Sequence, residues 1–258
     1  MSYAVVIPAR NEEKRIHFTL NSLKKQSIQP KKIVVIDDGS TDLTAFIAYL
    51  YTPYVFTLKD CGYSKLGKPE LAHVFNVGFK ECKKYDFVFV SGADCEYPNN
   101  YVQRLIKIMN KNPRLVMLSG IPENEKVNKT HVSGAGRLIR SSFFHQIGFK
   151  YPLVYGWESI PLFEAQWLGY QCCSIPITFR VYRKSGTNIT NYMDWGRGMR
   201  TLGYWFPMVW ARTIVFAKRY GVRSALQLIA GYYSLYQTPY SDELKQSVKQ
   251  KQIGYIKR

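Results

Sequence analysis

Short apolar runs alternate with helical segments along residues 1–118, and this alternation leaves few folds open to the chain. Each run is too short for a buried helix, is rich in Val, Ile and Phe, and is bounded by turn-forming or polar residues. Near-continuous apolar strands separated by helices indicate a mostly parallel sheet with helices on both faces, an α/β fold. The predicted strands are Tyr3–Ile7, Lys32–Ile36, Tyr54–Leu58, Phe87–Ser91 and Leu115–Leu118.

Helices are predicted between these strands. Ile16, Leu20 and Leu23 share one helical face, which predicts a helix over Glu12–Lys25. Ser40 or Thr41 is the expected cap of a helix that runs through Tyr51. Further helices are predicted from Pro69 to about Lys84 and from Asn99 or Asn100 onward.

Polar residues gather where three of the predicted strands end. In parallel sheets, ligands bind beyond the carboxyl ends of the strands. Carboxylates at that edge can accept hydrogen bonds from a nucleoside or hold a metal ion, and simple solvated turns do not require them in this number. The residues are Arg10 and Glu12 after the first strand, Asp37 and Asp38 after the second, and Asp94 and Glu96 after the fourth.

The composition narrows the class of protein. The 258 residues include 36 Lys plus Arg against 18 Asp plus Glu, a net charge of +18, which favours an anionic partner. Five cysteines without regular spacing argue against a disulfide scaffold and for a reducing compartment. The chain turns polar after Ala9, so we expect no secretory signal and a cytoplasmic location. The longest apolar stretch, 202–217, is interrupted by Pro207 and Arg212 and predicts contact with a membrane surface rather than a crossing.

Two motifs about 20 residues apart, VVIPARNEE (5–13) and IVVIDDGSTD (33–42), resemble the opening of the family 2 glycosyltransferases. The resemblance extends over residues 3–183 and implies a GT-A fold and a nucleotide-diphosphate sugar as donor, either a UDP- or a GDP-hexose. Later segments that resemble the family are GKPELAHVFNVGF (67–79), FVSGADCEYP (89–98), SGAGRLIRSSFFHQIGF (133–149) and YGWESIPLFEAQWLGY (155–170).

The resemblance also implies roles for single residues on the donor side. The nucleoside pocket would be lined by Pro8, Arg10, Glu12 and Asp37 or Asp38. Lys68, in a glycine-flanked loop, would contact the diphosphate as a flexible point charge. A helix N-terminal carboxylate is the plain structural alternative for Glu12, and a surface lysine is the alternative for Lys68.

A divalent cation, Mn²⁺ or Mg²⁺, is expected from the family's DxD motif. Asp94 matches the second aspartate of that motif, and Glu96 is a further oxygen donor. The first aspartate is replaced by Gly92. Weak binding assisted by the substrate's phosphates is therefore the expected form.

On the acceptor side, Glu158 aligns with the family's catalytic aspartate, eleven residues before Gly169. It would be the general base of an inverting transfer to a hydroxyl, or would only orient the substrate if the acceptor is already a phosphate. A helix N-terminal carboxylate before Pro161 is the plain structural alternative for Glu158. IPITFRVYRKSG (175–186) resembles the polyprenyl-phosphate hexose synthases. This implies an acceptor phosphate held by Arg137, Arg140 and Arg183, with ordinary solvated arginines as the alternative.

The expected organisation is a GT-A catalytic domain at 1–187 and an aromatic, basic, mainly helical extension at 188–258. The extension is predicted to contact an anionic membrane on its inner face, with packing onto the catalytic core or a second subunit as the alternative. The acceptor would be a glycan or a polyprenyl phosphate. The competing functions are a sugar-phosphate nucleotidyltransferase and a basic nucleic-acid-binding protein. The first favours a glycine-rich loop after strand one, and the second leaves the acidic strand ends unexplained.

Overall fold

The computed structural model describes residues 1–123, 125–127, 131–183, 192–234 and 242–256. The chain divides into two compact units. The first comprises Met1–Ser64, His73–Lys150 and Leu168–Lys184, and the second comprises Lys65–Ala72, Tyr151–Trp167 and Ser185–Arg258. The second unit therefore contains the expected extension together with two segments from the expected catalytic domain.

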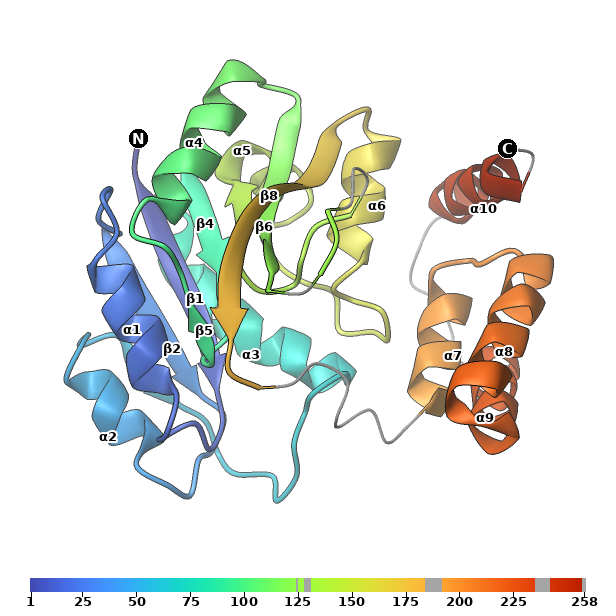
Figure 1. The fold of residues 1–258 in the computed structure, drawn as a ribbon, viewed down its shortest axis with the longest axis horizontal. Coiled ribbons are helices and arrows are strands. Elements are labelled where there is room, and N and C mark those ends of the chain that lie inside the picture. Colours follow the sequence, from blue (N-terminus) through green and yellow to red (C-terminus); the bar gives the residue numbers. More distant parts are fainter. Residues whose placement is uncertain (124, 128–130, 184–191, 235–241, 257–258) are drawn as a thin grey trace. The chain divides into compact units, whose positions relative to one another are not determined.

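The first unit is built on a mixed sheet (Figure 1) in the order β3-β2-β1-β4-β7-β6-β8-β5. Neighbours are parallel from β3 to β4 and between β6 and β8, whereas β7 and β5 run antiparallel to their neighbours. The strands are β1 (Tyr3–Ala9), β2 (Lys32–Asp37), β3 (Val55–Thr57), β4 (Phe87–Val90), β5 (Cys95–Glu96), β6 (Leu115–Pro122), β7 (Arg137–Arg140) and β8 (Gln171–Val181). The five predicted strands are confirmed, and β5, β7 and β8 are additional.

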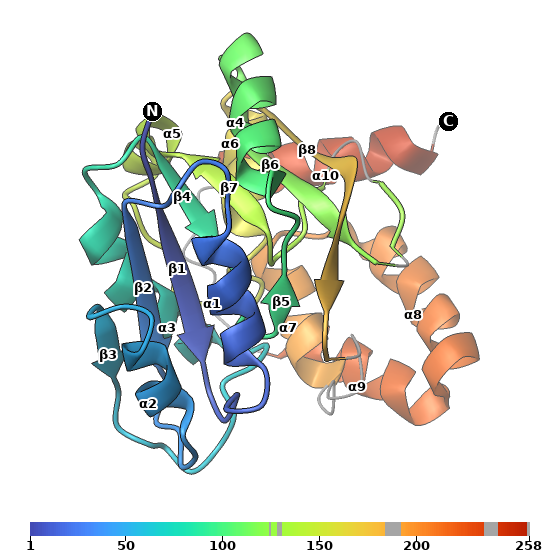
Figure 2. The same ribbon diagram turned by 60° about the vertical axis from the view of Figure 1, so that its left-hand side comes forward.

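Helices cover both faces of the parallel part of the sheet (Figure 2) because successive strand residues point to opposite sides. Val5 and Val35 belong to the core that includes Ile16 of α1 and Ala48 of α2. On the other face, a methyl group placed on Gly78 of α3 would meet the side chains of Ile36 at 2.5 Å and Val6 at 2.7 Å. The helices up to β8 are α1 (Ile16–Lys24), α2 (Thr44–Tyr49), α3 (Pro69–Phe79), α4 (Tyr101–Lys111), α5 (Ser141–Gln146) and α6 (Ile160–Trp167), with a 3-10 turn at Lys80–Cys82.

Two helix starts differ from the prediction. Helix α1 begins at Ile16 because the carbonyl of Glu12 accepts the N–H groups of Arg15 and Ile16 in a preceding turn. Helix α2 begins at Thr44, not after Ser40 or Thr41. Ser40 Oγ instead accepts the backbone N–H of Asn11 at 3.0 Å and so ties the loop after β2 to the loop after β1.

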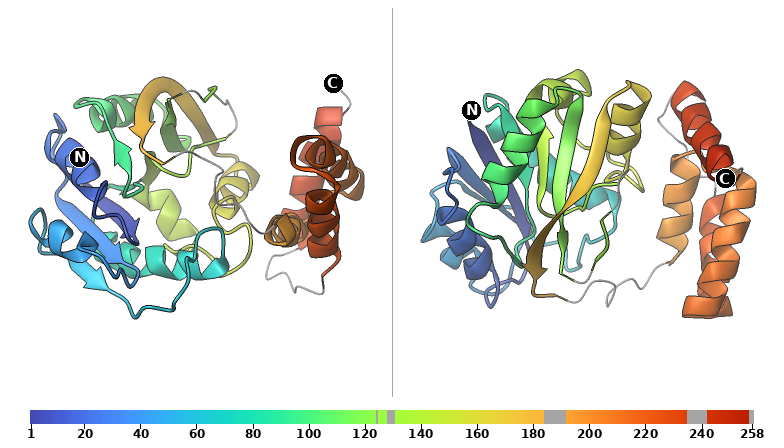
Figure 3. Two further views of the ribbon diagram at one scale, coloured as in Figure 1. Left: turned by 60° about the horizontal axis from the view of Figure 1, so that its bottom comes forward. Right: turned by 45° about the horizontal axis from the view of Figure 1, so that its top comes forward.

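The later helices of the second unit are α7 (Tyr192–Thr201), α8 (Phe206–Tyr220), α9 (Val222–Tyr233) and α10 (Asp242–Ile256). Helices α7, α8 and α9 lie together in Figure 3, and they share a core of Met199, Val209, Phe216, Ala225, Leu228 and Tyr232. A methyl group on Gly196 would lie 2.0 Å from the carbonyl of Leu228, so α7 and α9 meet backbone to backbone. No helix within the described ranges is long and apolar enough to cross a membrane.

Candidate functional site

Polar loops follow β1, β2 and β4 at one edge of the sheet. Ala9 is paired with Asp37, and Val6 with Val90, so these parallel strands end near one another. The loop after β1 holds Arg10 and Glu12, and the segment after β4 holds Asp94. The predicted gathering of strand ends is therefore present in the first unit, with Pro8 beside it in β1 opposite Ile36.

Arg10 braces the loops around the end of β2. Its Nη1 atom donates to the carbonyls of Asp38 and of Gly39, the latter at 3.0 Å, and its Nη2 atom lies 2.6 Å from Asp60 Oδ1. A hydrogen bond from the N–H of Gly62, together with Arg10, holds the pKa of Asp60 below its usual range. Arg10 thus fixes the backbone that carries the acidic pair.

Asp37 and Asp38 are both buried. Asp37 Oδ1 accepts the N–H of Ser40 at 3.1 Å, and the N–H of Asp38 donates to the carbonyl of Ala9 at 2.8 Å. One carboxylate therefore shapes the turn after β2, while the backbone of the other extends the pairing of β2 with β1.

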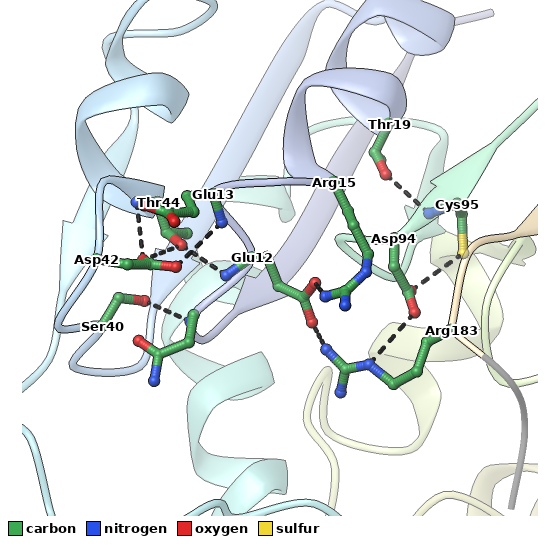
Figure 4. Close-up of polar contacts among 11 residues, drawn as sticks. Glu12, Glu13, Arg15, Thr19, Ser40, Asp42, Thr44, Asp94, Cys95 and Arg183 are labelled. Carbon is green, nitrogen blue, oxygen red and sulfur yellow. Dashed lines mark hydrogen bonds and ion pairs between the residues drawn. The ribbon is translucent and has the colours of Figure 1, made fainter. Parts of the chain in front are cut away.

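Three residues distant in sequence meet beyond the ends of β1 and β4. Figure 4 shows the guanidinium of Arg183 between the carboxylates of Glu12 and Asp94. Arg183 Nη2 is ion-paired with Glu12 Oε1, and its Nε lies 3.8 Å from Asp94 Oδ2. Arg15 Nη1 contacts the other oxygen of Glu12 at 2.8 Å. The Glu12 side chain is only 6% exposed and that of Arg183 is 35% exposed, so the cluster reaches solvent through the arginine.

Asp94 is held in place by its neighbours. The N–H of Cys95 donates to Thr19 Oγ1 at 2.9 Å, which ties the segment to α1. Burial raises the pKa of the Asp94 carboxyl, although hydrogen bonds and the charge of Arg15 act in the opposite direction. A methyl group on Gly92 would lie 2.9 Å from Asp94 Oδ1, so the glycine leaves room for this carboxylate.

Asp94 and Glu96 are the two residues predicted to hold a divalent cation. Glu96 accepts the Tyr182 hydroxyl at 2.7 Å and lies 3.7 Å from Arg180, whereas Asp94 contacts Arg183. Asp94 and Glu96 thus each contact an arginine near the end of β8, and their predicted roles as metal ligands stay predictions. Across the part of the chain that the structure describes, no three His, Cys, Asp or Glu side chains group into a metal site. One carboxylate fits Mg²⁺ or Mn²⁺ only where substrate phosphates and water complete the coordination.

The arginines predicted to hold an acceptor phosphate are separated. Arg137 pairs with Val90 at the carboxyl end of β4, and Arg140 pairs with Phe87 at its opposite end, because β7 is antiparallel to β4. Arg137 is buried and donates through Nε to the carbonyl of Ser133 at 3.0 Å. Arg140 donates to the carbonyl of Met109 at 2.8 Å. The register of β7 thus places Arg137 and Arg140 at opposite ends of its pairing with β4, and the role of these arginines and Arg183 at an acceptor phosphate stays a prediction.

Lys68 and Glu158 belong to the second unit. The carbonyl of Lys68 accepts the indole N–H of Trp157 at 3.1 Å, and Glu158, the next residue, is exposed just before α6. Their predicted roles at the diphosphate and as general base stay predictions.

Sequence reasoning missed three residues that complete the contacts at the edge. Arg15 lies one helical turn after Glu12, so its spacing could have indicated the ion pair. Asp60 and Tyr182 contact Arg10 and Glu96 across long stretches of chain, and no local pattern indicates such pairs.

Comparison with known proteins gives one family. The model of glycosyl transferase family 2 matches residues 4–185. A 4,4'-diaponeurosporenoate glycosyltransferase of Staphylococcus aureus (strain bovine RF122 / ET3-1) is 46% identical over 59 residues, which are 23% of this chain. The match spans only 16% of that relative's length.

Solved structures show the same fold at low identity. Staphylococcus aureus TarS 1-349 in complex with UDP has a TM-score of 0.59 at 17% identity, over 99% of this chain and 78% of that one. Mannosyltransferase PcManGT from Pyrobaculum calidifontis, in complex with GDP-Man and Mn²⁺, has a TM-score of 0.59 at 16% identity, over 99% and 80%. Both support the GT-A fold expected from the sequence.

Proposed function

Because the chain belongs to glycosyl transferase family 2, we propose that this glycosyltransferase moves a hexose from UDP or GDP to a lipid-linked acceptor with inversion at the anomeric carbon. Family membership and fold support the use of a nucleotide sugar. The relative named for 4,4'-diaponeurosporenoate, a lipid-like acceptor, supports the lipid side of the proposal.

The contact that most supports a donor site is the placement of Arg183 between Glu12 and Asp94. A guanidinium carries five N–H donors in a planar fork, so those not used by the two carboxylates can meet phosphate oxygens. We assign Arg183 to the donor diphosphate rather than to an acceptor phosphate. Pro8, Arg10, Glu12, Asp37 and Asp38 would surround the nucleoside beside it.

The departing nucleoside diphosphate accumulates negative charge as the sugar leaves. Arg183 is proposed to stabilise that charge, and Asp94 is the residue that would hold Mg²⁺ or Mn²⁺ together with the diphosphate. Such a cation supplies charge neutralisation to the leaving group when bound. From the family resemblance, Glu158 is proposed to accept the proton of an acceptor hydroxyl.

The test combines binding and transfer. Calorimetric titration with UDP and GDP should give saturable binding of one of them. Incubation with the matching radiolabelled nucleotide-hexose and a bacterial lipid extract should then move label into the organic phase. Formation of pyrophosphate from a sugar phosphate and a nucleoside triphosphate would instead identify a nucleotidyltransferase. Binding of random oligonucleotides without nucleotide binding would overturn the enzymatic proposal.

A further inference from the structure

Helix α8 exposes large apolar side chains along one side. Phe206, Trp210 and Ile214 follow one another at intervals of four residues, so they share a helical face. Trp210 is 45% exposed and Ile214 is 56% exposed. The buried stripe of the same helix is a different one, formed by Val209, Thr213 and Phe216. The exposed stripe is therefore not needed for the core of this unit.

Helix α9 repeats the pattern. Val222, Leu226 and Tyr233 lie on one face and are exposed, with Leu226 at 63%. Its buried residues, including Ala225 and Leu228, point into the shared core. The rings of Phe206 and Tyr233 are 6.2 Å apart, so the two stripes meet at that end of the helix pair. We call Phe206, Trp210, Ile214, Val222, Leu226 and Tyr233 the α8–α9 face.

The charged side chains of this helix pair are all basic. Residues 206–234 contain four basic residues, Arg212, Lys218, Arg219 and Arg223, and no aspartate or glutamate. All four are exposed. Lys218 continues the four-residue interval of the α8 stripe beyond Ile214, and Arg219 and Arg223 flank the turn at Gly221. Apolar side chains bordered by cations, with no anion to favour a basic partner, match an anionic lipid surface.

We propose that the α8–α9 face binds the surface of an anionic bilayer, with both helices lying in the interface. Helix α8 has 15 residues and is about 22 Å long, shorter than the hydrocarbon core, so it can lie along the surface but cannot span it. Trp210 and Tyr233 are side chains that favour the headgroup region. Only the functional reason for this binding, access to a lipid-linked acceptor, rests on the proposed function.

The experiment is flotation with vesicles of phosphatidylglycerol and phosphatidylcholine, without donor or acceptor. The full chain should float with these vesicles and bind pure phosphatidylcholine at least tenfold more weakly. Trp210→Ser combined with Leu226→Ser should reduce binding at least tenfold. Lys218→Gln combined with Arg223→Gln should weaken binding about tenfold at low salt, and less at high salt, because each basic residue contributes through screened attraction.

A matched control is available at α2 and its C-cap, where Phe46 is 62% exposed and Leu50 is 69% exposed. Phe46→Ser combined with Leu50→Ser removes similar apolar surface from the first unit and should leave flotation unchanged. Circular dichroism and urea unfolding of every variant report folding of both units, so loss of flotation with the unfolding midpoint retained supports the proposal. Equal flotation of all variants would overturn it. So would a wild-type dimer in lipid-free solution that the Trp210 and Leu226 changes convert to monomer without changing flotation, since the face would then bind a second copy.

Discussion

At the carboxyl edge of the first unit, charged side chains are buried, whereas on the α8–α9 face of the second unit large apolar side chains are exposed. Either arrangement is uncommon in a soluble protein, where buried charges and large exposed apolar patches are the informative exceptions. Both arrangements cost free energy unless other interactions compensate for them. The two regions differ in whether those interactions come from within the protein.

The charges at the edge compensate one another inside the protein. Glu12 is paired with both Arg15 and Arg183, and Arg183 also approaches Asp94, so the cluster is close to neutral before any ligand binds. The α8–α9 face has no such internal compensation, because the helix core is already filled by other residues. Changes at the edge should therefore alter chemistry and ligand binding, and changes on the face should alter location.

The largest effect is expected from Asp94→Asn, which changes the carboxyl edge of the first unit and leaves the α8–α9 face unaltered. The amide cannot serve as an anionic partner for Arg183 or as a metal-binding carboxylate, and we expect turnover to fall by about 100-fold or more. Steady-state transfer measured with and without Mn²⁺ checks this. Asp86→Asn is the matched control, since Asp86 is exposed and bonded to Ser2 at the other end of β4. Similar rates for the two variants would remove Asp94 from the mechanism.

A second test concerns Glu158, which lies in the second unit but is proposed to act in the chemistry. Glu158→Gln should lower turnover by about 100-fold, as expected for loss of a general base, and leave nucleotide affinity unchanged. The measurement is kcat beside a calorimetric titration with the nucleotide. Glu70→Gln, an exposed change in the same unit, should leave both values unchanged. A normal kcat for the Glu158 variant would contradict the assignment.

A third test concerns Arg183 and asks whether the carboxyl edge of the first unit binds the donor diphosphate or an acceptor phosphate. Arg183→Gln should weaken binding of the nucleoside diphosphate about tenfold and leave binding of the nucleoside unchanged, because the guanidinium is assigned to phosphate. Titrations in EDTA exclude a metal contribution. Arg180→Gln, near the end of β8 and three residues before Arg183, is the control. If diphosphate affinity stays normal and the KM for the acceptor rises instead, Arg183 serves the acceptor phosphate.

The parallel part of the sheet was predictable because burial on both faces leaves continuous apolar runs. Val5 and Val6 point to opposite sides, yet both are fully buried, so the run in β1 could be recognised without knowing its neighbours. Strand β7 escaped prediction because it is four residues long and begins and ends with arginine. Strand β8 also escaped prediction, although it alternates buried and exposed residues over part of its length.

The site was predictable to the same extent. Arg10, Glu12 and Asp94 follow strands whose order is set by the parallel sheet, so their meeting at one edge could be expected. The contact of Arg183 with Glu12 depends on how β8 returns along the sheet, which is a tertiary property. The separation of Arg140 from Arg137 likewise follows from an antiparallel register that no local pattern gives.

The smallest expected effect comes from Glu164 on α6, a half-buried acid in the second unit. Burial raises the pKa of its carboxyl to about 7, above the value of an unfolded chain. The folded state therefore favours the protonated acid, so the stability present below about pH 4.5 is lost as pH rises through about 7. We expect Glu164→Gln to raise the free energy of unfolding, relative to the wild type, by about 2 kcal/mol more at pH 8 than at pH 4.5, after allowance for partial solvent screening. Urea unfolding of both proteins at the two pH values measures this, with the exposed Glu243→Gln as control. A stability difference that does not change with pH would show that Glu164 keeps its charge on folding.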